Sequence, residues 1–148
     1  MRYCTNRPDA LAWIQGGMDA PGLSGWVRFF QENGRVLIVT RICGLPDNET
    51  GFFGFHIHQD NSCSDAGFPG TGIHYSSPDQ PHPKHDGDLP PLLRCQGNAY
   101  MILKTDRFSV KDVIGRTIVI HIDPDDFYSQ PSGNAGRKIA CGVIRQVR

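Results

Sequence analysis

Histidine is almost absent from this chain of 148 residues, except in one stretch. Five of the six histidines lie between Gly54 and Asp88, and the sixth, His121, follows a short apolar run. If histidine served as general surface material, the residues would be scattered across both ends of the chain. The clustering indicates a specific role for the imidazoles, and the neighbouring carboxylates make metal binding the first candidate.

Other absences narrow the class of protein. The formal net charge is zero, because 15 lysines and arginines balance 15 aspartates and glutamates. This balance disfavours a globally basic nucleic-acid binder. No apolar run approaches the length of a membrane-spanning helix, and the first residues lack the apolar core of a signal peptide. We therefore expect one domain over 1–148 that is cytoplasmic and binds neither nucleic acid nor membrane. An exported, trimmed chain is the alternative.

A convincing helical period is also lacking, whereas turn residues are plentiful, with 17 glycines and 11 prolines. Short segments rich in β-branched residues alternate with these turns, which predicts an all-β sandwich or barrel. Ala10 to Gln15 is mixed in character and gives no clear strand pattern. The expected strands are 25–30, 35–43, 52–58, 98–104, 114–122 and 138–147, with an Asn-Gly hairpin turn between the first two.

The segment 60–91 has almost no regular pattern, although loops of this length are uncommon in compact domains. It consists mainly of glycine, proline, serine and aspartate, and it carries three of the histidines. A bound metal ion would order such a loop and hold it against the sheet. A second polar loop, 123–137, precedes the last strand.

His56 and His58 are two residues apart on an expected strand, so both imidazoles project from the same face. Two neighbouring imidazoles on a rigid element are well placed to bind a transition metal. The alternative is a pair of half-buried histidines satisfied by hydrogen bonds. His121, at the end of a β-branched strand, is either a third ligand or a satisfied core residue.

His82 and His85 have helical spacing, but prolines on both sides of His82 make a helix implausible. The two rings must therefore converge from a loop, where Asp88 can add an oxygen ligand. With His74 they form the three-histidine, one-carboxylate set of a structural zinc site. The alternative is a solvated polar loop.

The five cysteines leave at least one thiol unpaired, and their spacing does not assign the pairs. In a chain expected to be cytoplasmic, the default is that all five stay reduced.

Several motifs occur together in the order and near-spacing of a known family. They are Gly54-Phe55-His56-Ile57-His58, Gly72-Ile73-His74-Tyr75, His85-Asp86-Gly87-Asp88-Leu89, Gly115-Arg116-Thr117-Ile118-Val119-Ile120-His121, and Gly133-Asn134-Ala135-Gly136-Arg137-Lys138-Ile139-Ala140-Cys141-Gly142-Val143-Ile144. In these motifs the chain resembles copper/zinc superoxide dismutase, from about Ser24 to the C-terminus. The compact segment after His58 is more similar to bacterial than to animal members.

The resemblance implies an eight-stranded Greek-key β-barrel, similar to an immunoglobulin sandwich, with a metal-binding loop at about 59–91 and an electrostatic loop at about 122–137. It implies copper and zinc as cofactors. The residues that match the copper ligands are His56, His58, His74 and His121, and those that match the zinc ligands are His74, His82, His85 and Asp88. His74 is thus the shared ligand, and all six histidines are used.

Three further positions are implied by the same resemblance. Asp125 matches an outer carboxylate that links a copper ligand to a zinc ligand and so fixes ring orientation. Cys63 and Cys141 match the disulfide of the family, which leaves Cys4, Cys43 and Cys95 as free thiols.

The implied activity is enzymatic: superoxide is disproportionated to oxygen and hydrogen peroxide by redox cycling of a copper ion bridged to zinc through His74. The implied assembly is a homodimer, with a monomer as the alternative. Lys138 stands where the family has an arginine that guides the superoxide anion, and Arg137 precedes it. Lysine keeps the positive charge but loses the planar, two-pronged donor geometry. On the strand that starts here, we expect the two side chains to point to opposite faces.

Two other functions remain open at this point. One is a metal-binding or copper-delivery protein with weak or no turnover. The presence of Lys138 in place of the family's arginine favours this function. The other is a β-sandwich adhesion or binding domain with a loop held by zinc. The complete set of implied copper ligands favours the enzyme, with His74, Lys138 and Arg137 as its catalytic candidates.

Overall fold

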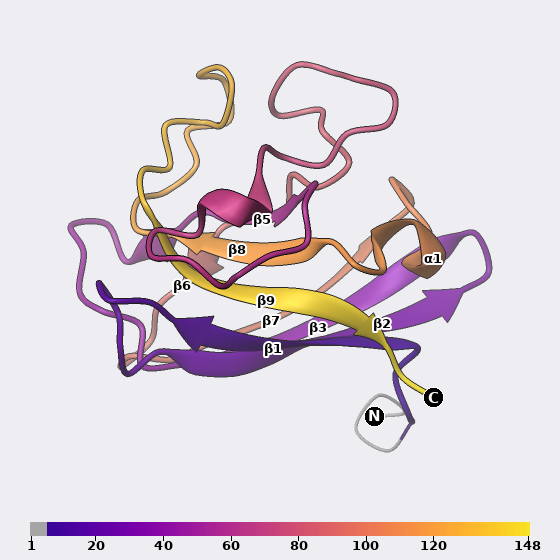
Figure 1. Cartoon of the computed structure of the whole chain (residues 1–148), viewed down its shortest axis with the longest axis horizontal. Helices are drawn as coiled ribbons and strands as arrows, with labels where there is room; N and C mark the ends of the chain where they lie inside the picture. The colour runs from indigo at the N-terminus through magenta and orange to yellow at the C-terminus, as the bar shows by residue number, and fades with distance from the viewer. Residues whose placement is uncertain (1–5) are drawn as a thin grey trace.

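The computed structural model describes residues 6–148, in which strands dominate (Figure 1). The strands are β1 (Ala10–Gly16), β2 (Ser24–Glu32), β3 (Arg35–Cys43), β4 (Phe52–Phe53), β5 (Phe55–His58), β6 (Leu92–Leu93), β7 (Ala99–Thr105), β8 (Thr117–His121) and β9 (Lys138–Gln146). Within residues 6–148 the helical segments are the 3₁₀ turn η2 (Pro69–Thr71) and the short helix α1 (Val110–Val113). No helix in residues 6–148 has the length and apolar character needed to span a bilayer.

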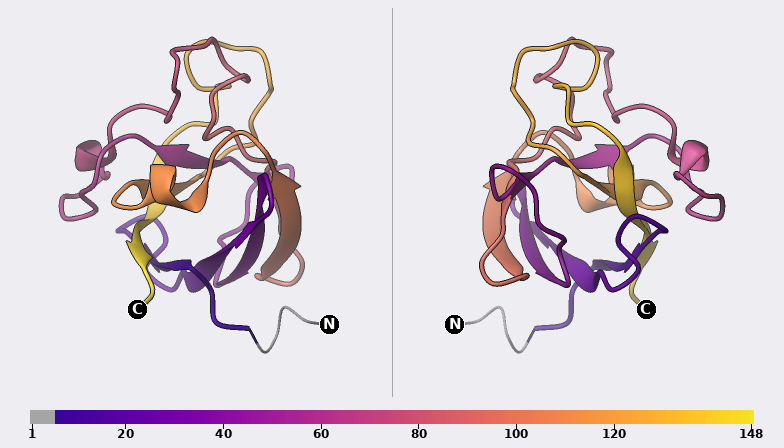
Figure 2. Two further views of the ribbon diagram at one scale, coloured as in Figure 1. Left: turned by 90° about the vertical axis from the view of Figure 1, so that its right-hand side faces the viewer. Right: turned by 90° about the vertical axis from the view of Figure 1, so that its left-hand side faces the viewer.

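The strands form one antiparallel sheet of seven strands in the order β5-β8-β9-β1-β2-β3-β7, and β4 pairs separately with β6. The large sheet curls around a closed interior, which is visible in the end-on views of Figure 2. Its inner face carries fully buried side chains, among them Phe29, Phe55, Ile57 and Ile118. The predicted all-β barrel is confirmed.

The strand β1 is the main element that the sequence pattern did not indicate. It pairs with β2 on one side and with β9, near the C-terminus, on the other. Ala10, Ala12 and Ile14 alternate into the core, although Ala is a weak strand former. Pairing with strands on both sides, one of them far away in the sequence, therefore decides the conformation of this segment.

The expected strand 52–58 divides at Gly54 into β4 and β5. The backbone of Gly54 donates to the carbonyl of Asp123 and accepts from the amide of His121, both at 2.8 Å. A Cβ at this position would lie 2.7 Å from the Cβ of Ala135. Glycine thus permits the close approach that ties the start of β5 to the end of β8.

A disulfide joins Cys63 to Cys141, as the family resemblance implied. It links the connection after β5 to strand β9 across 78 residues of sequence. Closing a loop of this size stabilises the folded state by about 4 kcal/mol on the chain-entropy model. Cys43 and Cys95 are free thiols, and Cys4 lies outside the described residues.

Two long connections rise from the same side of the barrel, above β5 and β8 (Figure 1). One runs from β5 to β6 through residues 59–91, and the other runs from β8 to β9 through residues 122–137. Backbone amides and side chains join the two connections; for example, the amide of His82 donates to Oε1 of Gln130 at 3.0 Å. The histidines of β5 and β8 (His56, His58 and His121) are buried beneath the two connections.

Candidate metal centre

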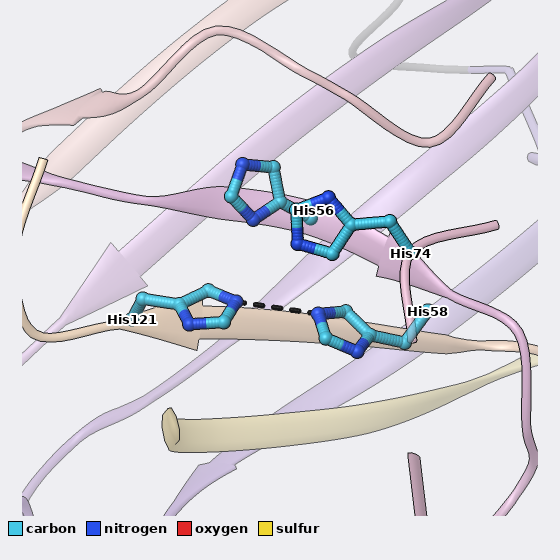
Figure 3. Close-up of side chains that lie close together, drawn as sticks. All are labelled: His56, His58, His74 and His121. Atoms are coloured by element: carbon cyan, nitrogen blue, oxygen red, sulfur yellow. Dashed lines mark hydrogen bonds between the residues drawn. The ribbon is translucent and has the colours of Figure 1, made fainter. Parts of the chain in front are cut away.

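Strand pairing brings three histidines to one face of the sheet. In the β5–β8 ladder, His56 is opposite Val119 and His58 is opposite Thr117. His121 is two residues beyond Val119, so it lies on the face that carries His56 and His58. The β8–β9 register shifts by one residue here, because Ile120 pairs with Ala140 and His121 with Lys138. Figure 3 shows the three rings together, with His74 beside them.

His74 reaches this group because its loop runs along the free edge of β5. The amide of Gln59 donates to the carbonyl of Ile73, and the amide of Tyr75 donates to the carbonyl of Ile57. These bonds make His74 and His58 an isolated antiparallel bridge pair. The loop thus adds a single bridge residue, His74, to the edge of the sheet, which fixes where the ring of His74 lies.

The first group of candidate ligands is His56, His58, His74 and His121, whose ligand atoms all lie within 4.8 Å of one another. Nδ1 of His58 faces the carbonyl oxygen of Gly72 at 2.8 Å, and Nδ1 of His121 faces that of Gly136 at 3.0 Å. A carbonyl oxygen only accepts, so both Nδ1 atoms carry the proton. In the neutral rings, both Nε2 atoms therefore present lone pairs.

Those two lone pairs face each other across 3.2 Å (Figure 3). Nδ1 of His56 and Nε2 of His74 are also buried and have no hydrogen-bond partner. Four nitrogen lone pairs thus converge in one buried space, an arrangement that is costly unless a cation lies among them. Imidazole ligands alone suit a transition metal such as copper.

The second group is His74, His82, His85 and Asp88, again with ligand atoms within 4.8 Å of one another. The Asp88 carboxylate lies 2.7 Å from Nδ1 of His74, 3.1 Å from Nδ1 of His82 and 3.0 Å from Nδ1 of His85. The His82 contact lacks hydrogen-bonding geometry, which leaves that nitrogen unpaired. Three imidazoles and one carboxylate form the closed tetrahedral set that is typical of structural zinc.

His74 belongs to both groups. Its Nδ1 faces Asp88 in the second group, so the unpartnered Nε2 is the atom available to the first. The ring lies 4.0 Å from that of His56 and 5.3 Å from that of His85, measured between centroids. One imidazole therefore separates two adjoining pockets and presents one nitrogen to each.

Asp125 joins the two groups from the outside. One carboxylate oxygen lies 2.7 Å from Nε2 of His56, and the other lies 2.8 Å from Nε2 of His82. The amide of Phe127 also donates to this carboxylate at 2.7 Å. Gly133, with φ of +72°, leaves the space for this link, because a Cβ there would collide with the carboxylate and with the His82 ring.

Burial sets the charge state of the rings. It lowers the pKa of His74 to about 4 and that of His121 to about 3, and it moves the pKa of His58 well below the usual value. Burial favours the protonated form of Asp125, but hydrogen bonds from His56 and His82 outweigh it and hold the pKa of this carboxyl below its usual range. At neutral pH His58, His74 and His121 are therefore neutral and Asp125 is ionised; neutral imidazole is the form that binds metals.

Lys138 and Arg137 are placed differently. Lys138 pairs with His121 in the β8–β9 ladder, and its Nζ donates to Oγ1 of Thr71 at 2.7 Å and to the carbonyl of Gly72 at 3.1 Å. The Gly72 carbonyl also holds His58, so the ammonium lies at the wall of the first pocket. Arg137 instead forms an exposed ion pair with Asp19, 3.1 Å between Nε and Oδ2.

Sequence reasoning did not assign the backbone acceptors of this site or the anchor of the lysine. Gly72 and Gly136 belong to two of the family motifs, but every residue has a backbone carbonyl, so the residue type does not show which carbonyl accepts a hydrogen bond. Thr71, fully buried beside Lys138, also went unassigned. Its position directly before Gly72 was the available signal.

The comparisons with known proteins agree with this geometry. A family model described as copper/zinc superoxide dismutase matches residues 23–144. The protein named superoxide dismutase [Cu-Zn] 2 of Aquifex aeolicus (strain VF5) is 35% identical over 136 residues, which cover 82% of this chain and 78% of that protein. Superoxide dismutase [Cu-Zn] 3 of Arabidopsis thaliana is 31% identical over 152 residues, 91% of this chain and 88% of the relative. The chain belongs to the copper/zinc superoxide dismutase family.

Proposed function

We propose that the protein is an active copper/zinc superoxide dismutase. Two superoxide anions and two protons would give one molecule of oxygen and one of hydrogen peroxide. The observation that carries the proposal is the convergence of four unprotonated nitrogens in one buried pocket, which shares His74 with a three-histidine, one-carboxylate pocket. Family membership gives independent support.

In this proposal, copper is held by the first group and zinc by the second. The copper ligands are His56 through Nδ1 and His58, His74 and His121 through Nε2; the zinc ligands are Nδ1 of His74, His82 and His85, and the carboxylate of Asp88. The copper ion would supply a reversible one-electron change, and the zinc ion a fixed positive charge beside it.

The surrounding residues position these ligands and hold protons. The carbonyls of Gly72 and Gly136 keep the protons of His58 and His121 on Nδ1, so that Nε2 stays available. When it is not bound to copper, Nε2 of His74 would carry a proton, while Nδ1 of the same ring remains directed at the zinc pocket. A proton carried at this atom lies beside the site where superoxide would react.

Lys138 would attract the substrate mainly through its charge. Its ammonium has three donors, and these are directed at the hydroxyl of Thr71 and the carbonyls of Gly72 and Phe68. Burial lowers the pKa of Lys138, and the negative charge of Asp60 opposes that shift. Arg137 is turned to Asp19, so we assign the guiding charge to Lys138.

The direct test is the decay of superoxide after pulse radiolysis, measured on protein loaded with copper and zinc. We expect the rate of decay to rise in proportion to protein concentration and to fall with added salt, because screening weakens attraction of the anion. Decay no faster than the spontaneous background would reject the enzyme and leave the metal-binding or copper-delivery function.

Neutralising Lys138 should slow catalysis more than neutralising its neighbour. We expect Lys138→Gln to reduce the second-order rate constant roughly tenfold at low salt and to flatten its salt dependence. Arg137→Gln removes the same charge from an exposed ion pair and serves as the matched control. Equal losses in the two variants would contradict the role given to Lys138.

Asp125→Asn should weaken metal binding. The amide has one oxygen acceptor, so one of the two ring N–H groups of His56 and His82 loses its partner. Loss of such an outer acceptor lowers metal affinity by about 10- to 100-fold. Affinities for zinc and copper can be measured by competition with chelators.

The control for that variant is Asp126→Asn. Asp126 is the adjacent carboxylate, and it accepts from the hydroxyl and amide of Ser129 and from the amide of Tyr128 rather than from a histidine. If Asp125→Asn bound both metals as tightly as Asp126→Asn does, the linking role of Asp125 would be wrong.

A further inference from the structure

The turn that carries His85 and Asp88 is held by a side chain from another part of the fold. Arg107 lies between β7 and α1, and its Nη1 donates to the carbonyls of His85 at 2.9 Å, Pro83 at 3.1 Å and Asp88 at 3.3 Å. In the described part of the chain, Arg107 forms no ion pair. Its guanidinium is therefore directed to the backbone of this turn.

The turn has little other support on that side. A cavity of about 460 Å³ lies beside it, lined by Pro83, Asp88, Arg107, Asp125 and Phe127 among others. Side-chain packing is therefore incomplete on this face of the turn, although Leu89, directly after Asp88, is buried in the core. The segment also lacks regular secondary structure. Fixing irregular backbone costs conformational entropy, so an anchor with several hydrogen bonds matters here.

His82 has an anchor of its own. Its amide donates to Oε1 of Gln130 at 3.0 Å, and Nε2 of Gln130 donates to its carbonyl at 2.7 Å. Gln130 belongs to the connection between β8 and β9, on which Asp125 also lies and holds the His82 ring. The two halves of the ligand turn thus have separate supports. Gln130 and Asp125 hold His82. Arg107 holds the carbonyls of His85 and Asp88, in addition to the backbone bridge between Asp88 and His56.

We infer that Arg107 is a positioning residue for the second pocket: it holds His85 and Asp88 in the arrangement that zinc requires before the metal binds. The inference rests on the proposed zinc role of these two residues. Arg107 touches neither substrate nor ligand atoms, and it acts through three backbone carbonyls.

The charge of Arg107 and its positioning role predict opposite effects on zinc affinity when the side chain is removed. A guanidinium this close to the pocket repels a divalent cation, so removing it should tighten zinc binding if charge alone matters. If Arg107 positions the turn, removing it should weaken zinc binding, because the metal must then order the turn as it binds. The sign of the change therefore distinguishes the two effects.

The experiment is a zinc titration of the metal-free full chain against a chromophoric chelator. We expect Arg107→Ala to bind zinc about tenfold more weakly than the wild type, in the range found for outer partners of metal ligands. Arg107→Lys keeps the charge and some donors, so its zinc affinity should lie between those of the wild type and Arg107→Ala. Copper affinity should be unchanged. Arg35→Ala, which removes an exposed arginine paired with Glu32, should match the wild type.

A second measurement does not depend on metal. Hydrogen exchange of the His85 and Asp88 amides should be faster in metal-free Arg107→Ala than in metal-free wild type, because both amides bond within this turn. Unchanged or tighter zinc binding together with unchanged exchange would overturn the inference. A wild type that binds no zinc would reject the proposed function, and the exchange comparison would still decide the role of Arg107.

Discussion

Burial of six imidazoles between the outer face of the barrel and the two long connections imposes the main constraint on this molecule. Each ring has two nitrogens, and a buried nitrogen without a partner is costly. The structure meets part of this demand with acceptors outside the cluster: the carbonyls of Gly72 and Gly136 and the carboxylate of Asp125. Nδ1 of His56, Nε2 of His74 and Nδ1 of His82 have no partner, and the Nε2 atoms of His58 and His121 face each other. Bound cations would satisfy these nitrogens together.

The two long connections supply these acceptors. Gly72 lies on the first connection, and Gly136 and Asp125 lie on the second. Cys63–Cys141 ties the first connection to β9, and Lys138 at the start of β9 bonds back to it through Thr71. Gln130 and Asp125 join the second connection to the first at His82. Loop order and metal-ligand geometry are therefore parts of one unit, and the barrel provides its rigid base.

Much of this could be predicted from the sequence. Alternation along β5 places His56 and His58 on one face, and turn residues together with β-branched runs indicate an all-β barrel. What could not be predicted depends on contacts between distant segments. The strand β1 is decided by its two neighbours, and the division at Gly54 by the approach of Ala135. The backbone acceptors and Arg107 carry no local signal, because their partners are carbonyl oxygens or lie far away in the sequence.

Anomalous X-ray diffraction at the copper and zinc absorption edges, from crystals of protein loaded with both metals, tests the sharing of His74 most directly. One copper ion should lie among His56, His58, His74 and His121, and one zinc ion among His74, His82, His85 and Asp88, on opposite nitrogens of the His74 ring. A single ion, or two ions of which only one contacts His74, would contradict the two-pocket arrangement.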